Sequence, residues 1–181
     1  NLGGNAEYFY KANDKSQLLK FLKEAKSNNL NITILGAGSN TLFRDNGVKG
    51  VVIKLGKDFS FIKILEKDVV QVGAATLDRK VANYAKENGL ANLEFLSCIP
   101  GSIGGAIKMN SGCYNDDISK VLLSVRAIDL NKFSEVNIGR EDIKFLYRGS
   151  SLPDDLIIIS AKLKCSISNK VEIEKKQNSL I

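Results

Sequence analysis

Four glycines and one of only two prolines lie within residues 96–114. Gly101, Gly104 and Gly105 follow Pro100 closely, and the surrounding residues are too apolar for an ordinary solvated loop. We therefore expect this segment inside the protein, where its backbone N–H groups need partners. Closely spaced glycines let bare backbone approach a flat or anionic ligand, so a cofactor cradle is one interpretation. Taken alone, the segment fits a tight turn between two strands equally well.

A second glycine loop, residues 36–42, directly follows a strand that we expect to be buried. A dinucleotide-binding Rossmann motif would need glycine where Thr41 stands, and no GK[ST] follows for a P-loop. What remains is a cluster of backbone N–H groups at 36–40, with the Ser39 hydroxyl and the Asn40 amide as extra donors. Such a cluster suits a pyrophosphate. Two such loops in one chain favour a ligand held between two subdomains.

The composition limits the chemistry. The 181 residues include no histidine, which excludes a Ser-His-Asp or Cys-His site, a histidine-ligated metal and a flavin linked through histidine. We expect no metal. Three cysteines without CxxC spacing fit reduced thiols, and we expect a cytoplasmic protein with no membrane segment. The net charge of +6 favours anionic ligands, but the lysines are scattered and no nucleic-acid signature is present.

Hydrophobic periodicity predicts the elements that must position the two loops. A helix to about Asn28, capped by Asn13 or Asp14, connects short strands, and a second helix starts at Thr76 and ends near Gly89. The chain ends in a third helix, 170–181. The expected strands are 6–10, 32–35, 51–55, 59–65, 69–72, 122–130, 134–138 and 156–165.

This order predicts an α+β fold of two subdomains. Residues 1–56 read as a small parallel sheet with a crossover helix, because strand, helix, strand, glycine loop and strand follow one another. Residues 57–181 read as a mainly antiparallel sheet flanked by helices, beginning with a hairpin that turns at Lys67-Asp68. The two glycine loops then belong to different subdomains.

Three strings carry a family resemblance. The strings are Leu35-Gly36-Ala37-Gly38-Ser39-Asn40 with Arg44-Asp45, Gly47 and Gly50-Val51-Val52-Ile53; Leu93-Glu94-Phe95-Leu96, Ile99-Pro100-Gly101-Ser102-Ile103-Gly104-Gly105-Ala106 and Met109-Asn110-Ser111-Gly112-Cys113-Tyr114; and Phe145-Leu146-Tyr147-Arg148-Gly149-Ser150. They resemble, in the same order, the two flavin-binding loops and the Tyr-Arg-x-Ser motif of the UDP-N-acetylenolpyruvoylglucosamine reductases (MurB), along essentially the whole chain.

The resemblance implies a two-subdomain FAD-binding fold of the vanillyl-alcohol-oxidase (PCMH) type, with FAD bound non-covalently. It also implies that NADPH reduces the flavin, which then reduces UDP-N-acetylglucosamine enolpyruvate to UDP-N-acetylmuramate in peptidoglycan precursor synthesis. The protein's part in such chemistry is to orient the cofactor and stabilise charge. We expect a monomer.

The resemblance also assigns roles to residues. In this interpretation Arg148 is catalytic, because a guanidinium fork can bind and stabilise the charge that builds toward the substrate carboxylate. Tyr114 and Tyr147 would lie near the substrate, although a structural role is nearly as compatible with either tyrosine. Ile99 and Ile158 would contact the flavin, although core packing is the stronger alternative for both, and Met109 is expected in the core. The residues assigned to the FAD diphosphate and its surroundings are Gly36, Ala37, Gly38, Ser39, Asn40, Pro100, Gly101, Ser102, Gly104 and Gly105.

The resemblance stops short of the family's C-terminal substrate domain. That domain carries the general-acid serine and a late glutamate, and nothing in residues 1–181 matches either. We therefore expect this chain to bind FAD and to reduce substrate poorly or not at all. Two alternatives stay open: another flavin oxidase or dehydrogenase of the same fold, and a nucleotide-binding module without chemistry.

Overall fold

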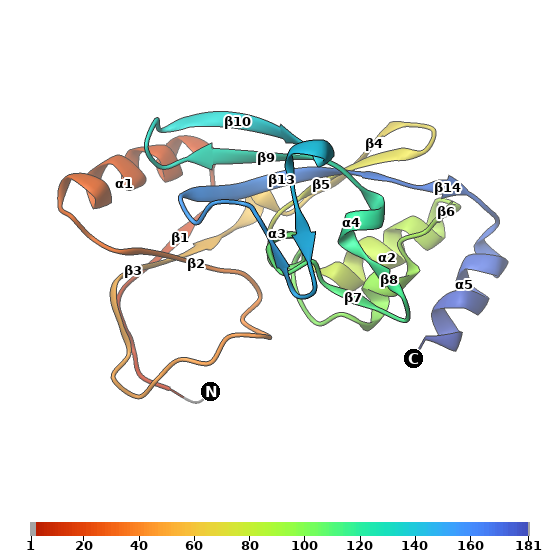
Figure 1. The fold of residues 1–181 in the computed structure, drawn as a ribbon, viewed down its shortest axis with the longest axis horizontal. Helices are drawn as coiled ribbons and strands as arrows, with labels where there is room; N and C mark the ends of the chain where they lie inside the picture. Colours follow the sequence, from red (N-terminus) through yellow and green to blue (C-terminus); the bar gives the residue numbers. More distant parts are fainter. Residues whose placement is uncertain (1–2, 181) are drawn as a thin grey trace.

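The computed structural model describes residues 3–180, and its first sheet is small and parallel. In this three-stranded sheet, in the order β1-β3-β2, both neighbouring pairs run parallel, as predicted. A helix crosses from the first strand to the second (Figure 1). The elements are β1 (Ala6–Ala12), α1 (Lys15–Ser27), β2 (Ile32–Leu35) and β3 (Val48–Leu55).

Helix α1 follows directly from its sequence. The carboxylate of Asp14 accepts a hydrogen bond of 2.8 Å from the Gln17 N–H, which satisfies one of the free donors at the helix start. Leu18, Leu22 and Ala25 recur at helical spacing and are all buried. Local chemistry therefore determines both where this helix begins and which face it buries.

The second sheet is antiparallel throughout and has five strands in the order β10-β9-β13-β5-β4. Its central strand is the most apolar one, because it has a neighbour on each edge and packs into the core. The predicted α+β class is confirmed. The strands are β4 (Ile62–Glu66), β5 (Val69–Gly73), β9 (Leu122–Asp129), β10 (Ser134–Gly139) and β13 (Leu156–Lys164).

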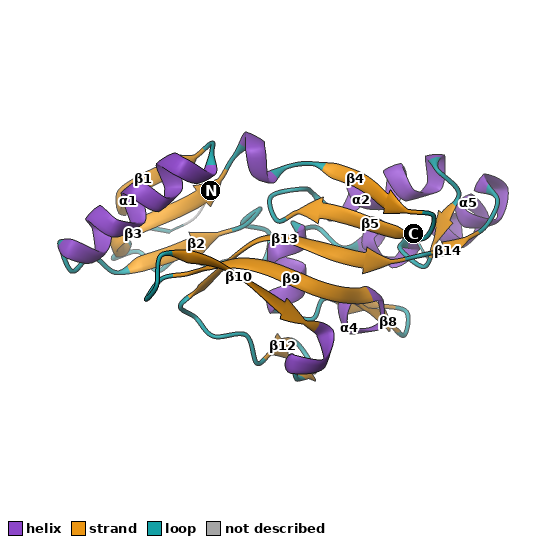
Figure 2. Ribbon diagram, turned by 90° about the horizontal axis from the view of Figure 1, so that it is seen from above, coloured by secondary structure: helices purple, strands orange, loops and turns teal. Residues whose placement is uncertain are grey.

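Helices and three small two-stranded sheets flank the five-stranded sheet (Figures 1 and 2). The helices are α2 (Asp78–Glu87), α3 (Ile103–Lys108), α4 (Ile118–Val121) and α5 (Lys170–Ser179), with 3-10 turns at Lys57–Phe59, Glu94–Cys98 and Arg140–Asp142. The small sheets pair β6 (Leu90–Ala91) with β14 (Ser166–Ile167), β7 (Gly112–Cys113) with β8 (Asp116–Asp117), and β11 (Phe145–Leu146) with β12 (Gly149–Ser150).

Helix α3 differs from the sequence prediction, which treated its residues as part of a loop. It contains Gly104 and Gly105, which disfavour a helix. Ile103, Ala106 and Ile107 nevertheless share one face of the helix and are buried, and α3 packs on β13 and β5. Tertiary packing therefore overrides the local preference here.

The buried apolar side chains of both sheets form one continuous cluster. Leu18 and Ile53 contribute from the first sheet region, and Val72 and Ile157 from the second. The first sheet ends at Leu55 and the second begins at Ile62. The sequence predicted a division of the chain at residue 56. That division stays a prediction. Within residues 3–180, no helix has the length and apolarity needed to cross a bilayer.

Candidate cofactor-binding site

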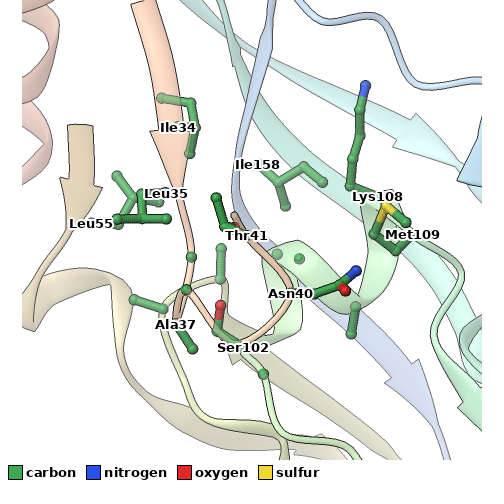
Figure 3. A pocket seen from close by; sticks show the side chains of 18 of the residues that line it. Ile34, Leu35, Ala37, Asn40, Thr41, Leu55, Ser102, Lys108, Met109 and Ile158 are labelled. Carbon is green, nitrogen blue, oxygen red and sulfur yellow. The ribbon is translucent and has the colours of Figure 1, made fainter. Parts of the chain in front are cut away.

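A cavity of about 690 Å³ lies between the two glycine loops (Figure 3). Its volume falls in the upper part of the roughly 300–1,000 Å³ range of small-molecule and cofactor sites. All the residues that the sequence assigned to the cofactor lie on its wall: Gly36, Ala37, Gly38, Ser39, Asn40, Ile99, Pro100, Gly101, Ser102, Gly104, Gly105 and Ile158.

The two loops contact each other directly at one end of the cavity. The Ser39 hydroxyl donates a hydrogen bond to the carbonyl oxygen of Pro100. A Cβ atom at Gly36 would lie 2.9 Å from Ser102 Oγ, so a side chain at Gly36 would force the Ser102 side chain to move. The Ser39 hydroxyl was expected to be a donor for the ligand, but here it joins the loops.

The first loop leaves its backbone donors available. Within the described part of the chain, no hydrogen bond uses the N–H groups of residues 37–40, and these residues are all exposed. Gly38 has a φ of +81°, which L side chains rarely adopt. Successive free N–H groups in such a turn form a concave anion-binding surface.

Strand β2, which leads into this loop, is only half-buried, so the expectation of a buried strand is wrong. It occupies an edge of the three-stranded sheet, and Ile34 remains 40% exposed. The edge position has a consequence for the site. Because no further strand covers β2, its residues Ile32–Leu35 form part of the cavity wall.

The second loop is bound to the scaffold through its backbone. The Gly104 N–H donates to the Ala74 carbonyl oxygen at 2.9 Å, and the Ile103 N–H donates to the Thr76 carbonyl oxygen at 3.0 Å. A Cβ at Gly104 would lie 3.1 Å from the Ala74 Cβ. Gly104 therefore serves the close approach of α3 to the scaffold, and its N–H is not available for a ligand.

The end of α3 forms another part of the wall. Met109, which was expected in the core, is 36% exposed and lines the cavity, so that expectation is wrong. The neighbouring Lys108 ammonium lies 2.8 Å from a carboxylate oxygen of Asp154. This contact lowers the pKa of Asp154 below its ordinary value.

The residues predicted to contact substrate form a separate group, the hairpin-tip cluster: Tyr114, Tyr147 and Arg148. None of the three lines the cavity. Arg148 Nη1 donates to the Gly112 carbonyl oxygen at 3.4 Å, and the guanidinium carbon lies 5.5 Å from the centre of the Tyr147 ring. The contact with Gly112 brings the turn between β11 and β12 beside strand β7.

The hairpin-tip cluster is attached to the cavity through α3. The Ser150 hydroxyl donates to the Lys108 carbonyl oxygen at 3.0 Å, and Lys108 lines the cavity. The side chains at the tips are open to solvent, since Tyr147 is 91% and Tyr114 is 64% exposed. A substrate that contacted these residues would therefore lie beside the cavity.

Two of the tip residues have uncommon backbone conformations. Arg148 has a φ of +59° and Tyr114 a φ of +50°, in the left-handed region that non-glycine residues rarely enter. Tyr114 and Asn115, which has a φ of +65°, together form the two-residue connection between β7 and β8. This pattern is typical of a type I′ hairpin turn, which points the tip side chains outward.

Asp78 is one of the polar residues of the cavity wall that sequence reasoning missed. Its side chain is completely buried, and neither carboxyl oxygen has a hydrogen-bond partner within residues 3–180. Burial raises the pKa of Asp78 to about 7. An acidic residue in the first turn of a helix is ordinarily a surface partner of the helix dipole, so nothing in the sequence distinguished it.

The buried carboxyl of Asp78 predicts an unusual dependence of stability on pH. In the unfolded chain Asp78 ionises near pH 3.9, but in the folded protein it keeps its proton to about pH 7. Between about pH 4 and about pH 7, the folded state therefore binds one more proton at Asp78 than the unfolded state does. The contribution of Asp78 to the free energy of unfolding falls as pH rises from about 4 to about 7. Asp78→Asn removes this titration.

We expect the Asp78→Asn protein to gain stability relative to the unmodified protein as pH rises across this window. The difference is at most about 4 kcal/mol, at 1.36 kcal/mol per pKa unit. Urea unfolding of both proteins at pH 4, 5.5 and 8 measures it. If the two proteins differed by the same free energy of unfolding at all three pH values, the Asp78 carboxyl would have its ordinary pKa in the folded protein.

The residues of the cavity fit an FAD molecule. The free N–H groups of residues 37–40 suit a diphosphate. Ile99 and Ile158 supply apolar surface for a flat ring, and Gly36 presents backbone without a Cβ to the cavity. Bound FAD would be held by Gly36–Asn40 on one side and by the Ile99–Gly105 segment on the other.

Comparison with known proteins supports the same ligand. Residues 6–132 match the family model described as "FAD binding domain". The reductase of Pelagibacter ubique named UDP-N-acetylenolpyruvoylglucosamine reductase is 46% identical over 174 residues, which cover 96% of this chain and 57% of the relative. The reductase of the same name from Rickettsia bellii is 40% identical and is covered to 59%.

The fold has a solved counterpart as well. The crystal structure of UDP-N-acetylenolpyruvylglucosamine reductase (MurB) from Thermus caldophilus superimposes with a TM-score of 0.82 at 28% identity, covering 95% of this chain and 60% of that one. This chain thus spans a little more than half the length of the relatives it matches. It belongs to the FAD-binding domain family, in which it corresponds to the flavin-binding part of the UDP-N-acetylenolpyruvoylglucosamine reductases.

Proposed function

We propose that this chain holds FAD non-covalently between its two glycine loops. We further propose that the whole protein uses NADPH to reduce UDP-N-acetylglucosamine enolpyruvate to UDP-N-acetylmuramate. This reaction belongs to peptidoglycan precursor synthesis in the cytoplasm. The relatives' shared name supports the substrate.

One observation carries the FAD part of the proposal: the two loops face each other across a single cavity. The hydrogen bond from Ser39 to Pro100 joins them, and the N–H groups of residues 37–40 remain available. The diphosphate would bind to these N–H groups. The net charge of +6 favours such an anionic ligand over a neutral one.

The hairpin-tip cluster supports a substrate site next to the cofactor. Bound FAD supplies the transfer of hydride from NADPH to the substrate double bond. Charge then builds toward the substrate carboxylate, and the Arg148 guanidinium can bind a carboxylate through two parallel hydrogen bonds. Tyr147 and Tyr114 would contact the sugar or phosphate groups, because each presents a phenol at a solvent-exposed tip.

Visible absorption of the purified protein tests the proposal. We expect FAD added to this chain to bind with a shifted and structured flavin band. In a chain extended to the length of its relatives, we expect NADPH to bleach that band and the enolpyruvyl substrate to restore it. The matched control is the extended chain given NADPH without substrate, under nitrogen, which should stay bleached.

Each other outcome has a distinct meaning. Absence of FAD binding would refute the cofactor assignment. FAD binding without bleaching by NADPH in the extended chain would indicate a nucleotide-binding module without chemistry. Fast reoxidation by oxygen together with indifference to the UDP-sugar would indicate a flavin oxidase of the same fold.

A further inference from the structure

Three buried side-chain oxygens within residues 3–180 have no hydrogen-bond partner, and all three belong to the cavity wall. They are Asp78 Oδ1, Asp78 Oδ2 and Ser102 Oγ. Buried polar atoms are nearly always satisfied, so each exception needs an explanation. Ser102 already belongs to the second glycine loop, whereas Asp78 has no role in the function proposed above.

Asp78 lies directly against the second glycine loop. Its backbone N–H donates to the Gly101 carbonyl oxygen at 3.2 Å, and the adjacent Leu77 pairs with Ser102 in an isolated antiparallel bridge. A Cβ atom at Gly101 would lie 2.6 Å from Asp78 Oδ2. The carboxyl group is thus packed behind the part of the loop that lines the cavity.

Among residues 3–180, no cation pairs with this carboxyl group. On α2 itself, Arg79 and Lys80 are exposed, and Arg79 Nε donates to the Ser97 carbonyl oxygen at 3.4 Å. The segments facing Asp78, residues 97–102 and 74–76, contain no charged side chain, and neither does the first loop at 36–40. Two lysines, Lys54 and Lys108, line the cavity. The Lys108 ammonium is paired with Asp154, and neither lysine donates a hydrogen bond to the Asp78 carboxyl.

We propose that Asp78 controls the affinity of the site for its anionic cofactor: the cavity binds the diphosphate of FAD while the Asp78 carboxyl is neutral and binds it poorly once the carboxyl is ionised. This inference rests on the proposed binding of FAD to the two loops. An ionised carboxylate would place an unscreened negative charge behind the loop, in a medium where like charges repel strongly. Binding therefore takes up a proton whenever the free protein has lost it.

The titration of Asp78 falls in the range where the effect can be measured. Burial raises its pKa to about 7, and the chain has no histidine to titrate there. Asp78→Asn keeps the size of the side chain and removes its charge. Any other group that titrates near neutrality, such as the α-amino group, is unchanged in this variant.

The test is a titration of FAD binding by fluorescence between pH 6 and pH 8.5. We expect the Kd of the unmodified protein to rise about tenfold over this range, which corresponds to a shift of one pKa unit on binding. We expect the Kd of Asp78→Asn to stay constant and to match the low-pH value of the unmodified protein. Asp142→Asn, which removes an exposed carboxylate outside the cavity wall, should keep the tenfold rise.

Calorimetry in two buffers of different ionisation enthalpy provides a second measurement that needs no variant. Near pH 8 the unmodified protein should take up about 0.4 proton per FAD bound, for a pKa that rises by one unit from about 7, and the heat should differ between the buffers accordingly. A Kd independent of pH together with no proton uptake would overturn the inference while leaving FAD binding intact. A rise of the Kd with pH in Asp78→Asn equal to that of the unmodified protein would also overturn the inference. Absence of FAD binding at every pH would overturn both this inference and the proposed function.

Discussion

Gly38→Val is expected to weaken FAD binding by at least about tenfold, and to do so without unfolding the protein. Gly38 has a φ of +81°, and left-handed backbone costs an L residue roughly 1–2 kcal/mol, more for a β-branched one. The loop must therefore change its conformation, which disperses the N–H groups of residues 37–40. A tenfold change in Kd corresponds to about 1.4 kcal/mol.

The position of Gly38 separates loss of binding from loss of folding. A Cβ atom at Gly38 would meet only Leu35 Cδ1, at 3.9 Å, and the loop is exposed. Fluorescence titration with FAD measures the effect, and thermal unfolding of the apoprotein measures the fold. Gly149→Ala is the matched control, since a Cβ there has no neighbour within 4 Å. Equal affinities in both variants would show that the first loop does not hold the diphosphate.

Arg148→Ala is expected to reduce turnover by about a thousandfold or more in a chain extended to the length of its relatives. Removing one group that stabilises developing charge typically costs 10²–10³ in kcat. Arg148 additionally supplies a bidentate fork for the carboxylate. Because its side chain does not line the cavity, FAD should remain bound and the protein should remain yellow.

Two further variants sharpen this test. Arg148→Lys keeps the charge but loses the paired donors, so it should recover only a small part of the activity. Arg126→Ala removes a guanidinium that pairs with Glu135 and does not line the cavity, so it should leave turnover unchanged. Steady-state kinetics measure the turnover of each variant, and its absorption spectrum shows whether FAD is bound. Full activity in Arg148→Ala would remove Arg148 from the substrate site.

Much of the fold could be predicted because it is encoded over short distances along the chain. The helix after Asp14 and the strand β13 were predicted almost to the residue, since capping and apolar runs act within a few positions. The parallel first sheet followed from the order of its elements. The second glycine segment was harder, because the packing of α3 on β13 and β5 involves distant residues.

The candidate site was likewise predicted only where it depends on residues close together in the chain. The residues alone pointed to both glycine loops, because each is a local pattern of residue types, whereas the Tyr-Arg-x-Ser string was identified through the family resemblance. The sequence did not reveal the exposure of Met109 or the isolation of Asp78. Both depend on which surfaces the sheets and helices cover, and burial is a property of the whole fold.

By itself, the sequence determined that this protein has two backbone-rich turns suited to an anion and no histidine for catalysis or metal binding. Only the tertiary structure decided that the two turns face each other through Ser39 and Pro100, that the hairpin tips lie beside the cavity, and that a carboxyl group is buried behind one turn. The physical reason is the distance along the chain over which each interaction acts. Turn and helix preferences act between neighbours in the chain, whereas a cavity and the pKa of a group in its wall arise from contacts between segments far apart in sequence.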